Sequence, residues 1–219
     1  MTVYQLPKEN LFPHPALADK NGLLAVGGDL NPGRLLLAYA NGIFPWYSQG
    51  DPILWWSPDP RCVLFPAEFK TSKSLRQSIR REKYSFRVNT AFDEVIEACA
   101  SAQDRSDLPG WLTEEMKDAY KHLYRLGYVW SVETWADDQL AGGLYGVKIG
   151  SLFCGESMFY HRRDASKAAL KFLCENAGNL EIEVIDVQEC TQHLLSLGAR
   201  NMERVAFLNM LELMMNSEK

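Results

Sequence analysis

A carboxylate and an amide stand two residues apart at the end of a segment that alternates apolar and polar residues. The segment is Glu181-Ile-Glu-Val-Ile-Asp-Val-Gln188, and its period of two predicts a β-strand on which Asp186 and Gln188 share one face. A carboxylate can accept a proton, whereas a neutral amide is too weak a base and can only orient a partner. The pair indicates a recognition or catalytic site, unless it serves to cap the following helix.

A second carboxylate, Glu156, lies in a stretch that is otherwise apolar or small. A strand is predicted for this stretch, Leu152-Phe-Cys-Gly-Glu-Ser-Met-Phe159. The strand expected to pair with it in a hairpin contains three glycines, in Gly142-Gly-Leu-Tyr-Gly146. Glycines inside strands often mark the close approach of a ligand. Burying an unpaired carboxylate is unfavourable, so Glu156 either has a backbone or cationic partner or receives an amine or cationic ligand.

The cysteines and histidines show no pattern that binds metal. The five cysteines are odd in number and irregularly spaced, without a Cys-x-x-Cys motif, and the four histidines are scattered. We expect reduced, mostly buried thiols, no metal and no cofactor. Cys154 could be proposed as a nucleophile, but no base is placed beside it by the sequence.

Three of the six tryptophans lie in residues 42–61, a stretch whose prolines and glycines argue against a regular helix and most central strands. Rings on a proline-fixed backbone can stack a purine or line an apolar pocket at small entropic cost. Alternatively, these rings are buried and fill part of the hydrophobic core. Trp55 and Trp56 are adjacent and so are not expected to serve one site together. Trp46, which follows Pro45, is expected to be exposed.

Residues 70–83 form a local basic patch in a chain whose net charge is −5, with six Lys and Arg against one acid. On a helix, the cations would share one face while Leu75 and Ile79 turn to the core. Such a stripe suits a phosphate backbone, and the acidic remainder favours a limited contact with one RNA region over general DNA binding. Alternatively, it is a solvated face. The cations of the stripe are Lys73, Arg76, Arg80 and Lys83.

The elements that must position these groups are predicted from periodicity and stop signals. Residues 1–62 read as a small N-terminal domain, mostly loop, with one helix that starts at Asn31 or Pro32 and ends at Gly42. Residues 63–219 form a second domain, interrupted by a polar break at 103–110. Strands are expected at 62–65, 85–88, 128–135, 139–149, 151–159 and 181–188, and helices at 72–81, 91–102, 113–126, 165–176, 191–197 and 205–215.

The three strands between 128 and 159 predict an antiparallel meander, so the fold class is α+β with a mostly antiparallel central sheet. The element order resembles the architecture of the GCN5-type acetyltransferases. The longest apolar runs fall short of the ~20 residues needed to cross a bilayer, and the N-terminus lacks the features of a secretory signal. We therefore expect a cytoplasmic protein that does not bind membranes.

Several motifs together resemble the bacterial leucyl/phenylalanyl-tRNA protein transferases, over nearly the whole chain from Leu24 to Met210. The tryptophan-proline stretch and the run containing Glu156 are the most specific of them. The motifs are Gly27-Gly-Asp-Leu, Gly42-Ile-Phe-Pro-Trp, Trp55-Trp-Ser-Pro-Asp-Pro-Arg61, Trp111, Leu152-Phe-Cys-Gly-Glu-Ser-Met-Phe159, Ala165-Ser-Lys167, Asp186-Val-Gln188 and Ser196-Leu-Gly-Ala199.

The resemblance implies an enzyme that moves Leu, Phe and less often Met from an aminoacyl-tRNA to the α-amino group of proteins beginning with Arg or Lys. The product would carry an N-terminal degradation signal. The partners would be the aminoacyl-tRNA and the acceptor protein, and we expect a monomer without a cofactor.

The resemblance also implies roles for single residues. Trp46 and Trp111 would hold the terminal adenosine of the tRNA, and the basic stripe would meet its acceptor stem. Asp186 and Gln188 would be the catalytic pair, and Glu156 would lie close to the aminoacyl group. From its chemistry we hypothesise that Asp186 takes the proton, directly or by relay, while Gln188 orients the amine or the ester carbonyl. Recognition of an N-terminal Arg or Lys requires a carboxylate within reach, which is either Asp186 or Glu156. For selectivity against β-branched side chains, the expected pocket walls are Leu144, Phe153, Leu170 and Ile185.

Two positions depart from the family pattern. Thr191 stands where Asn is usual, and Phe172-Leu173 exchanges the usual aromatic position. The first departure weakens an orienting role at residue 191, and the second blurs the assignment of the pocket wall.

Two other functions are compatible with parts of the sequence. An acyl-CoA-dependent N-acetyltransferase would need a Gly-x-Gly turn before a helix to cradle pyrophosphate, and the chain has none. A non-enzymatic tRNA-binding module would explain the basic stripe and the tryptophans, but it would leave Asp186, Gln188 and Glu156 without a role.

Overall fold

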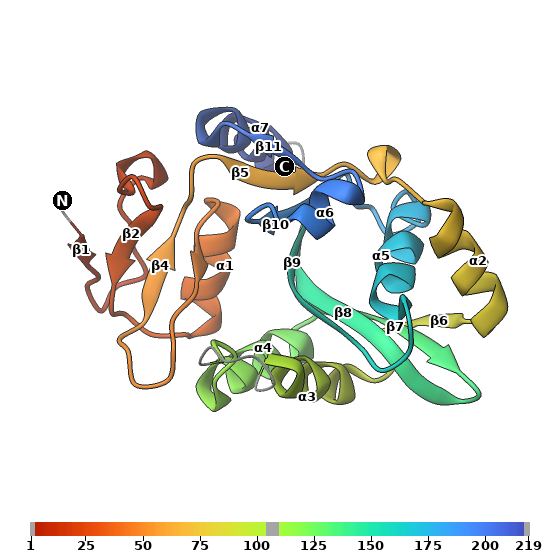
Figure 1. Cartoon of the computed structure of the whole chain (residues 1–219). Helices are drawn as coiled ribbons and strands as arrows, with labels where there is room; N and C mark the ends of the chain where they lie inside the picture. Colours follow the sequence, from red (N-terminus) through yellow and green to blue (C-terminus); the bar gives the residue numbers. More distant parts are fainter. Residues whose placement is uncertain (1–2, 104–109, 217–219) are drawn as a thin grey trace.

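The computed structural model describes residues 3–103 and 110–216, so the polar break expected at 103–110 lies almost wholly outside the described residues. A small four-stranded sheet near the N-terminus is followed by a seven-stranded sheet with helices on both faces (Figure 1). The predicted α+β class, with a small N-terminal domain and a mostly antiparallel central sheet, is confirmed. The domain division proposed between residues 62 and 63 falls within strand β5 (Arg61–Leu64).

The N-terminal region contains more strands than the sequence indicated. Its sheet has the order β1-β2-β4-β3, and these strands were missed because segments of two to four residues are too short to display a period of two, although most of the described residues in this region lie in loops and turns as expected. The expected helix is confirmed as α1 (Pro32–Ala40), where the Asn31 side chain accepts a hydrogen bond from the Arg34 amide, 2.9 Å. The strands are β1 (Tyr4–Gln5), β2 (Leu23–Val26), β3 (Phe44–Pro45) and β4 (Leu54–Trp56).

The aromatic stretch forms the β3–β4 hairpin, in which Phe44 pairs with Trp56. The exclusion of a central strand is wrong, since β4 itself holds no proline and lies inside the sheet, while Pro45 occupies the edge strand β3. Trp55 is completely buried and donates its indole N–H to the Gly27 carbonyl, 2.8 Å. Trp46 is 46% exposed, as predicted.

The large sheet has the order β11-β5-β10-β9-β8-β7-β6. Among the described residues, β9 and β10 are its one parallel pair, and the meander of β7, β8 and β9 is confirmed. The short edge strand β11 was not anticipated. The remaining strands are β6 (Ser85–Val88), β7 (Val129–Ala136), β8 (Gln139–Ile149), β9 (Leu152–Tyr160), β10 (Val184–Gln188) and β11 (Arg200–Met202).

Helices cover both faces of the β7–β9 meander. The helices α3 and α4 lie on one face and α5 on the other, with α2 packed beyond α5 (Figure 1). Successive residues of β8 serve the two cores, since Leu144 belongs to the α5 side and Tyr145 to the α3–α4 side. The helices are α2 (Lys73–Glu82), α3 (Phe92–Gln103), α4 (Glu114–Arg125), α5 (Ala165–Glu175), α6 (Gln192–Ser196) and α7 (Arg204–Asn216), with 3-10 turns at Pro15–Leu17 and Pro66–Glu68.

Two of the five cysteines are not reduced thiols, which corrects the expectation. Cys62 and Cys190 form a disulfide with their Cα atoms 5.1 Å apart. The two are 128 residues apart in the chain, and only the pairing of β10 with β5 brings them together, so local spacing could not reveal the bond. The free thiols of Cys99, Cys154 and Cys174 are buried, as expected.

Within 3–103 and 110–216, no helix is both long and apolar enough to cross a membrane. The same residues contain no group of three or more His, Cys, Asp or Glu side chains placed to hold a metal ion.

Most of the hairpin glycines are needed by the protein's own packing. A Cβ on Gly142 would lie 2.6 Å from the Cβ of Ala165, and one on Gly143 would lie 2.8 Å from the Val132 carbonyl oxygen. A Cβ on Gly146 would overlap the Cys154 carbonyl oxygen and lie 2.7 Å from the Phe153 ring. The expectation that these glycines admit a ligand is therefore corrected, because chain atoms already fill the space.

We expect Gly146→Ala to lower the free energy of unfolding by about 1–3 kcal/mol, since the added methyl group must displace backbone and an aromatic ring. The matched control is Gly155→Ala on the paired strand, where the nearest atom would be 3.8 Å away, so we expect a change within about 0.5 kcal/mol. Urea unfolding of both variants measures the difference. Equal losses would contradict the packing argument.

Candidate active site

A cavity of about 430 Å³ lies between the N-terminal hairpin and strands β8, β9 and β10. Its walls carry aromatic residues from the hairpin and apolar residues from the large sheet, with few polar groups among them. The predicted site residues that line it are Trp46, Trp111, Leu144, Phe153, Glu156, Leu170, Ile185 and Gln188. Asp186 is not among the lining residues, and the four cations of the basic stripe lie elsewhere, on α2 and at its C-terminal cap.

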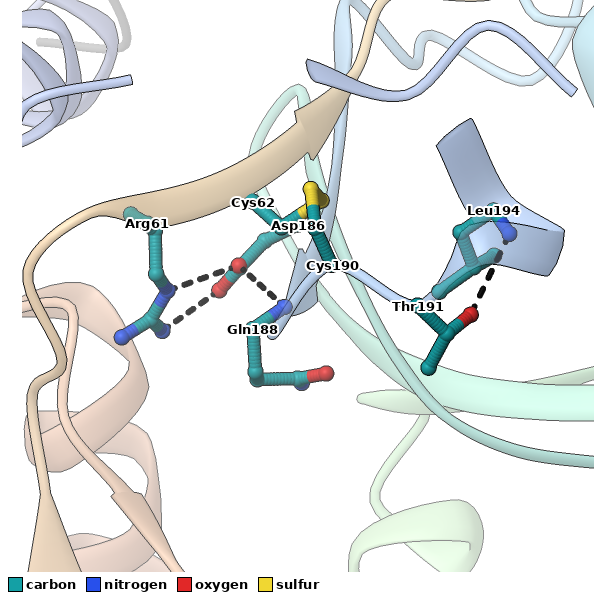
Figure 2. The surroundings of a disulfide bond; sticks show 7 residues. All are labelled: Arg61, Cys62, Asp186, Gln188, Cys190, Thr191 and Leu194. Carbon is teal, nitrogen blue, oxygen red and sulfur yellow. Dashed lines mark hydrogen bonds and ion pairs between the residues drawn. A yellow bond between two sulfur atoms is a disulfide. The ribbon is translucent and has the colours of Figure 1, made fainter. Parts of the chain in front are cut away.

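Asp186 is held by Arg61 in a buried ion pair (Figure 2). Arg61 Nε and Nη2 donate to Asp186 Oδ1 and Oδ2 at 2.8 and 2.6 Å, and both side chains are 1% exposed. Burial alone would lower the pKa of Arg61, but the Asp186 carboxylate outweighs it and the net shift is upward. Both Asp186 oxygens are therefore occupied by the guanidinium.

Arg61 also links Asp186 to two other parts of the fold. Its Nη1 donates to the Gly42 carbonyl at 2.9 Å, and its guanidinium lies 4.9 Å from the Phe44 ring centre and 4.8 Å from that of Phe207. These contacts come from the N-terminal hairpin and from α7. Arg61 therefore positions the end of β10 relative to the hairpin wall of the cavity.

The end of β10 is irregular at Gln188. The pairing with β5 shifts between Asp186 and Gln188, and Gln188 has a φ of +57°, which is uncommon for a residue with a side chain. Its amide N–H donates to Asp186 Oδ1 at 3.0 Å, which fixes this conformation (Figure 2). The bulge places Gln188 in the cavity lining, whereas Asp186 lies behind it. The period of two predicted for this pair thus ends before Gln188.

Glu156 is half-buried in the cavity wall and accepts hydrogen bonds from neutral groups. The Tyr120 hydroxyl donates to its Oε2 at 2.7 Å, and the Gln188 side-chain amide donates to its Oε1 at 3.2 Å. Removal from water raises the pKa of Glu156 to about 7, and the Tyr120 hydroxyl partly offsets this increase. A carboxyl group that titrates near neutral pH can act as a general base or acid.

Tyr120 in turn contacts the N-terminal region. Its hydroxyl lies 2.8 Å from the hydroxyl of Tyr39 on α1, and both rings are buried. The Tyr120 and Tyr39 hydroxyls both hydrogen-bond the Glu156 carboxylate and lower its pKa. Burial raises the pKa of both phenols well above the usual value, so both remain protonated donors.

The aromatic wall of the cavity is built by the β3–β4 hairpin and the segment before α4. Trp46 and Trp56 pack edge to face with ring centres 5.9 Å apart, and the Trp56 indole donates to the Trp46 carbonyl at 2.7 Å. Trp111 is half-buried just before Thr113, which caps α4. The structure thus brings Trp46 and Trp111 to the cavity that also holds Glu156 and Gln188.

Several residues of the site had not been identified from the sequence. Trp56 belongs to the aromatic stretch already singled out, and Met158 follows Glu156 at the strand period, so both carried a local signal. Arg61 ends one of the family motifs, but its role, like those of Tyr39 and Tyr120, depends on partners far away in the chain and had no local signal. Further unpredicted lining residues are Phe44, Tyr145, Val187, Glu189, His193 and Leu194.

The positions that depart from the family pattern have local structural roles. Thr191 lines the cavity, and its hydroxyl caps α6 by accepting a hydrogen bond from the Leu194 amide at 3.2 Å. Phe172 stacks on Phe86 with ring centres 4.9 Å apart, and Leu173 is completely buried. Neither Phe172 nor Leu173 lines the cavity.

Lys73, Arg76 and Arg80 of the basic stripe lie on the exposed face of α2, whereas Lys83, predicted to continue that face, is the C-cap with a φ of +51°. All four cations of the stripe are exposed, while Leu75 is buried and Ile79 packs against the same core. None of the four forms an ion pair with a described residue. In Figure 1, α2 lies on the opposite side of α5 from the N-terminal sheet.

Solved structures that share elements with this chain have low sequence identity to it. A GCN5-related N-acetyltransferase from Kribbella flavida has a TM-score of 0.36 and 13% identity over 79% of this chain and 62% of that one. The structure of L-PGS from Bacillus licheniformis has a TM-score of 0.41 and 11% identity over 75% of this chain and 52% of that one.

Sequence comparisons give much closer relatives. Proteins named leucyl/phenylalanyl-tRNA–protein transferase from Desulfatibacillum aliphaticivorans and Syntrophobacter fumaroxidans are each 51% identical over 211 residues. These alignments cover 96% of this chain and 91% and 90% of the relatives. The one from Photobacterium profundum is 51% identical over 207 residues, covering 94% of this chain and 86% of that relative.

Family profiles match both parts of the chain. The profile of the leucyl/phenylalanyl-tRNA protein transferase N-terminal domain matches residues 28–59, and that of leucyl/phenylalanyl-tRNA protein transferase matches residues 63–212. With these matches and the relatives at 51% identity, the chain belongs to the leucyl/phenylalanyl-tRNA protein transferase family.

Proposed function

We propose that this enzyme transfers Leu, Phe and less often Met from an aminoacyl-tRNA to the α-amino group of proteins that begin with Arg or Lys. The product carries an N-terminal degradation signal. The observation that carries the proposal is one cavity shared by Trp46, Trp111, Glu156 and Gln188, with an apolar wall for the transferred side chain. The names of the close relatives support the donor and the type of reaction.

The donor occupies the aromatic and apolar walls. The terminal adenosine of the tRNA stacks on Trp46 and Trp111, which have rigid rings on fixed backbone. The aminoacyl side chain enters among Leu144, Phe153, Leu170 and Ile185, which line the same cavity. An unbranched Cβ is favoured where the walls are close, and this selects Leu, Phe and Met over Ile and Val.

The chemistry needs a neutral amine and correct alignment more than a strong catalyst, because an aminoacyl ester is already activated. The amine nitrogen attacks the ester carbonyl carbon, the bond from that carbon to the ribose oxygen breaks, and the amine proton must be removed. We assign proton acceptance to Glu156, whose pKa is raised to about 7. Gln188 orients the amine or the ester carbonyl, since a neutral amide cannot act as a base.

Asp186 is assigned a positioning role in place of the proton-accepting role expected from the sequence. Both of its oxygens receive hydrogen bonds from Arg61, and Oδ1 also fixes the Gln188 amide. Asp186 therefore acts on the reaction through Gln188. It also contributes to the raised pKa of Glu156 through charge repulsion.

The acceptor's cationic first side chain requires a carboxylate near the cavity. Asp186 is occupied by Arg61, and the carboxylates that line the cavity are Glu156 and Glu189. Glu189 is exposed and forms no ion pair with a described residue. We assign it the contact with the Arg or Lys side chain, while Glu156 serves the α-amino group.

The direct test is transfer of labelled leucine from charged tRNA to matched peptides that begin with Arg, Lys or Ala, with acetyl-CoA as a parallel donor. We expect transfer to the Arg and Lys peptides only, and none from acetyl-CoA. Glu189→Gln should raise KM for the Arg peptide about tenfold, the loss of one charge-assisted contact, with little change in kcat. Binding of tRNA without transfer would favour a non-enzymatic module, and acetyl transfer would favour an acetyltransferase.

The ionisation of Glu156 should determine the acidic limb of the pH–rate profile, that is, how the transfer rate falls as the pH is lowered. Its ionised form accepts the proton, so the rate should fall as pH drops through about 7, and Glu156→Gln should lower the rate about 100-fold. Tyr120→Phe removes a donor that lowers the pKa of Glu156, so the limb should move to higher pH. The control is Tyr124→Phe on the same helix, whose hydroxyl donates to the Asn89 carbonyl instead. A profile unchanged in Tyr120→Phe would exclude Glu156 as the base.

The proton that binds to the Glu156 carboxyl group also affects the stability of the fold. Because the folded state binds it more tightly than the unfolded state, the free energy of unfolding should fall between pH 4.5 and 7 by up to about 3 kcal/mol relative to Glu156→Gln. Urea unfolding at several pH values measures this difference without reference to activity.

The face of α2 should carry the salt-dependent part of tRNA binding. We expect the double substitution Arg76→Glu and Arg80→Glu to raise KM for aminoacyl-tRNA at least tenfold. It should also reduce the slope of log KM against log salt concentration by about one to two, because each phosphate contact releases counterions. The control is Lys8→Glu with Lys20→Glu, the same charge change at exposed positions of the N-terminal region. Equal effects of both pairs would indicate a net-charge effect without a specific contact.

A further inference from the structure

The Cys62–Cys190 disulfide joins the large sheet to a segment at the rim of the cavity (Figure 2). Cys62 lies on β5 directly after Arg61, the partner of Asp186. Cys190 lies two residues after Gln188, between Glu189 and Thr191, which both line the cavity. The disulfide is therefore next to residues that position or line the proposed site in both of the chain segments that it connects.

The segment from Glu189 to Thr191 has few other attachments. The pairing of β10 with β5 ends where Gln188 meets Cys62. Beyond it, the Glu189 amide donates to the Val187 carbonyl at 2.7 Å, and the Thr191 side chain and carbonyl cap α6. Among the described residues these hydrogen bonds are local, and Cys190 and Leu194 pack against the core that contains Cys62, so the disulfide is the covalent attachment of the rim segment to the sheet.

The two sulfurs also differ chemically from the other cysteines. Burial raises the pKa of Cys99 and of Cys174 to about 12 and that of Cys154 well above its usual value, so these thiols stay protonated and poorly reactive. Cys62 is completely buried, whereas Cys190 is half-buried. Cys190 is therefore the more exposed residue of the pair, and we place the attack of an external thiolate there.

We propose that Cys62 and Cys190 form a reversible dithiol–disulfide site whose oxidised state holds the cavity rim in the conformation that binds the acceptor. This inference rests on the proposed function. Reduction by a dithiol proceeds by attack of its thiolate on Cys190, release of the Cys62 thiolate, and displacement of the mixed disulfide by the second thiol of the reductant. Oxidation removes two electrons and two protons from the thiols and converts one hydrogen peroxide into two waters.

The expected effect falls on binding more than on the chemical step. Gln188 remains fixed by Asp186 and Glu156 in either state, because those hydrogen bonds do not involve the sulfurs. Glu189 and Thr191 lose their covalent attachment to β5 on reduction, and they form the rim. Reduction should therefore raise KM for the acceptor while leaving kcat within about twofold.

The test compares transfer kinetics of the oxidised and the dithiol-reduced full-length chain, with thiol alkylation and mass measurement reporting the redox state. We expect KM for the Arg peptide to rise about fivefold or more on reduction and to recover after treatment with hydrogen peroxide. Cys190→Ser should show the KM of the reduced protein under all conditions. Cys174→Ser, which removes a buried free thiol, should retain the full response. Equal KM in the two states, or a response that persists in Cys190→Ser, would overturn the inference.

A second measurement does not depend on transfer activity. Amide hydrogen exchange should be faster in residues 187–195 of the reduced protein and unchanged in β8 and β9. If neither redox state transfers leucine, the proposed function fails, and faster exchange confined to 187–195 would still support control of the rim by the disulfide. Identical exchange in the two states would refute it.

Discussion

The buried ion pair between Arg61 and Asp186 is the interaction on which the site depends. Removing two charges from water is unfavourable by several kcal/mol per ion, and it is tolerated only where geometry and further hydrogen bonds compensate. Here the guanidinium binds the carboxylate at two points, donates to the Gly42 carbonyl, and lies against two aromatic rings. Asp186 Oδ1 also accepts a hydrogen bond from the backbone N–H of Gln188. One pair thus connects the N-terminal hairpin, β5, β10 and α7.

The two carboxylates near the cavity have different environments and hence different roles. Asp186 is completely enclosed and neutralised by a cation, so it orders the backbone of Gln188. Among the described residues, Glu156 receives hydrogen bonds from the neutral groups of Tyr120, Tyr39 and Gln188. Removal from water raises its pKa to about 7, and the charge of Asp186 contributes to the increase. Two nearby carboxyl groups, one paired with a cation and one surrounded by neutral donors, are typical of sites that move protons near neutral pH.

Neither part of the chain forms the cavity alone. The hairpin of the N-terminal sheet supplies Trp46, Trp56 and Phe44, while the large sheet supplies Glu156 and the apolar wall. The contact between Tyr39 and Tyr120 extends the hydrogen-bonded chain of Glu156 into α1. The position of the N-terminal sheet is therefore coupled both to the shape of the cavity and to the ionisation of Glu156.

The sequence by itself determined the longer regular elements and part of the cavity wall. Caps such as Asn31, Ser72 and Thr113 mark helix starts, and the alternation along β7 to β9 marks the meander, because these signals depend on neighbouring residues. The motifs singled out Trp46, Trp111, Glu156 and Gln188. Strands of two to four residues in the N-terminal sheet escaped, since they are set by pairing and not by a local pattern.

Tertiary structure alone decided what each polar group does. Arg61 meets Asp186 from 125 residues away, and Cys62 meets Cys190 from 128 residues away. The bulge that separates Gln188 from Asp186 arises in the pairing of β10 with β5. A side chain's charge state and reach depend on which groups surround it in space, so Asp186 and Glu156, alike as acids in the sequence, became a structural anchor and a titrating group only on folding.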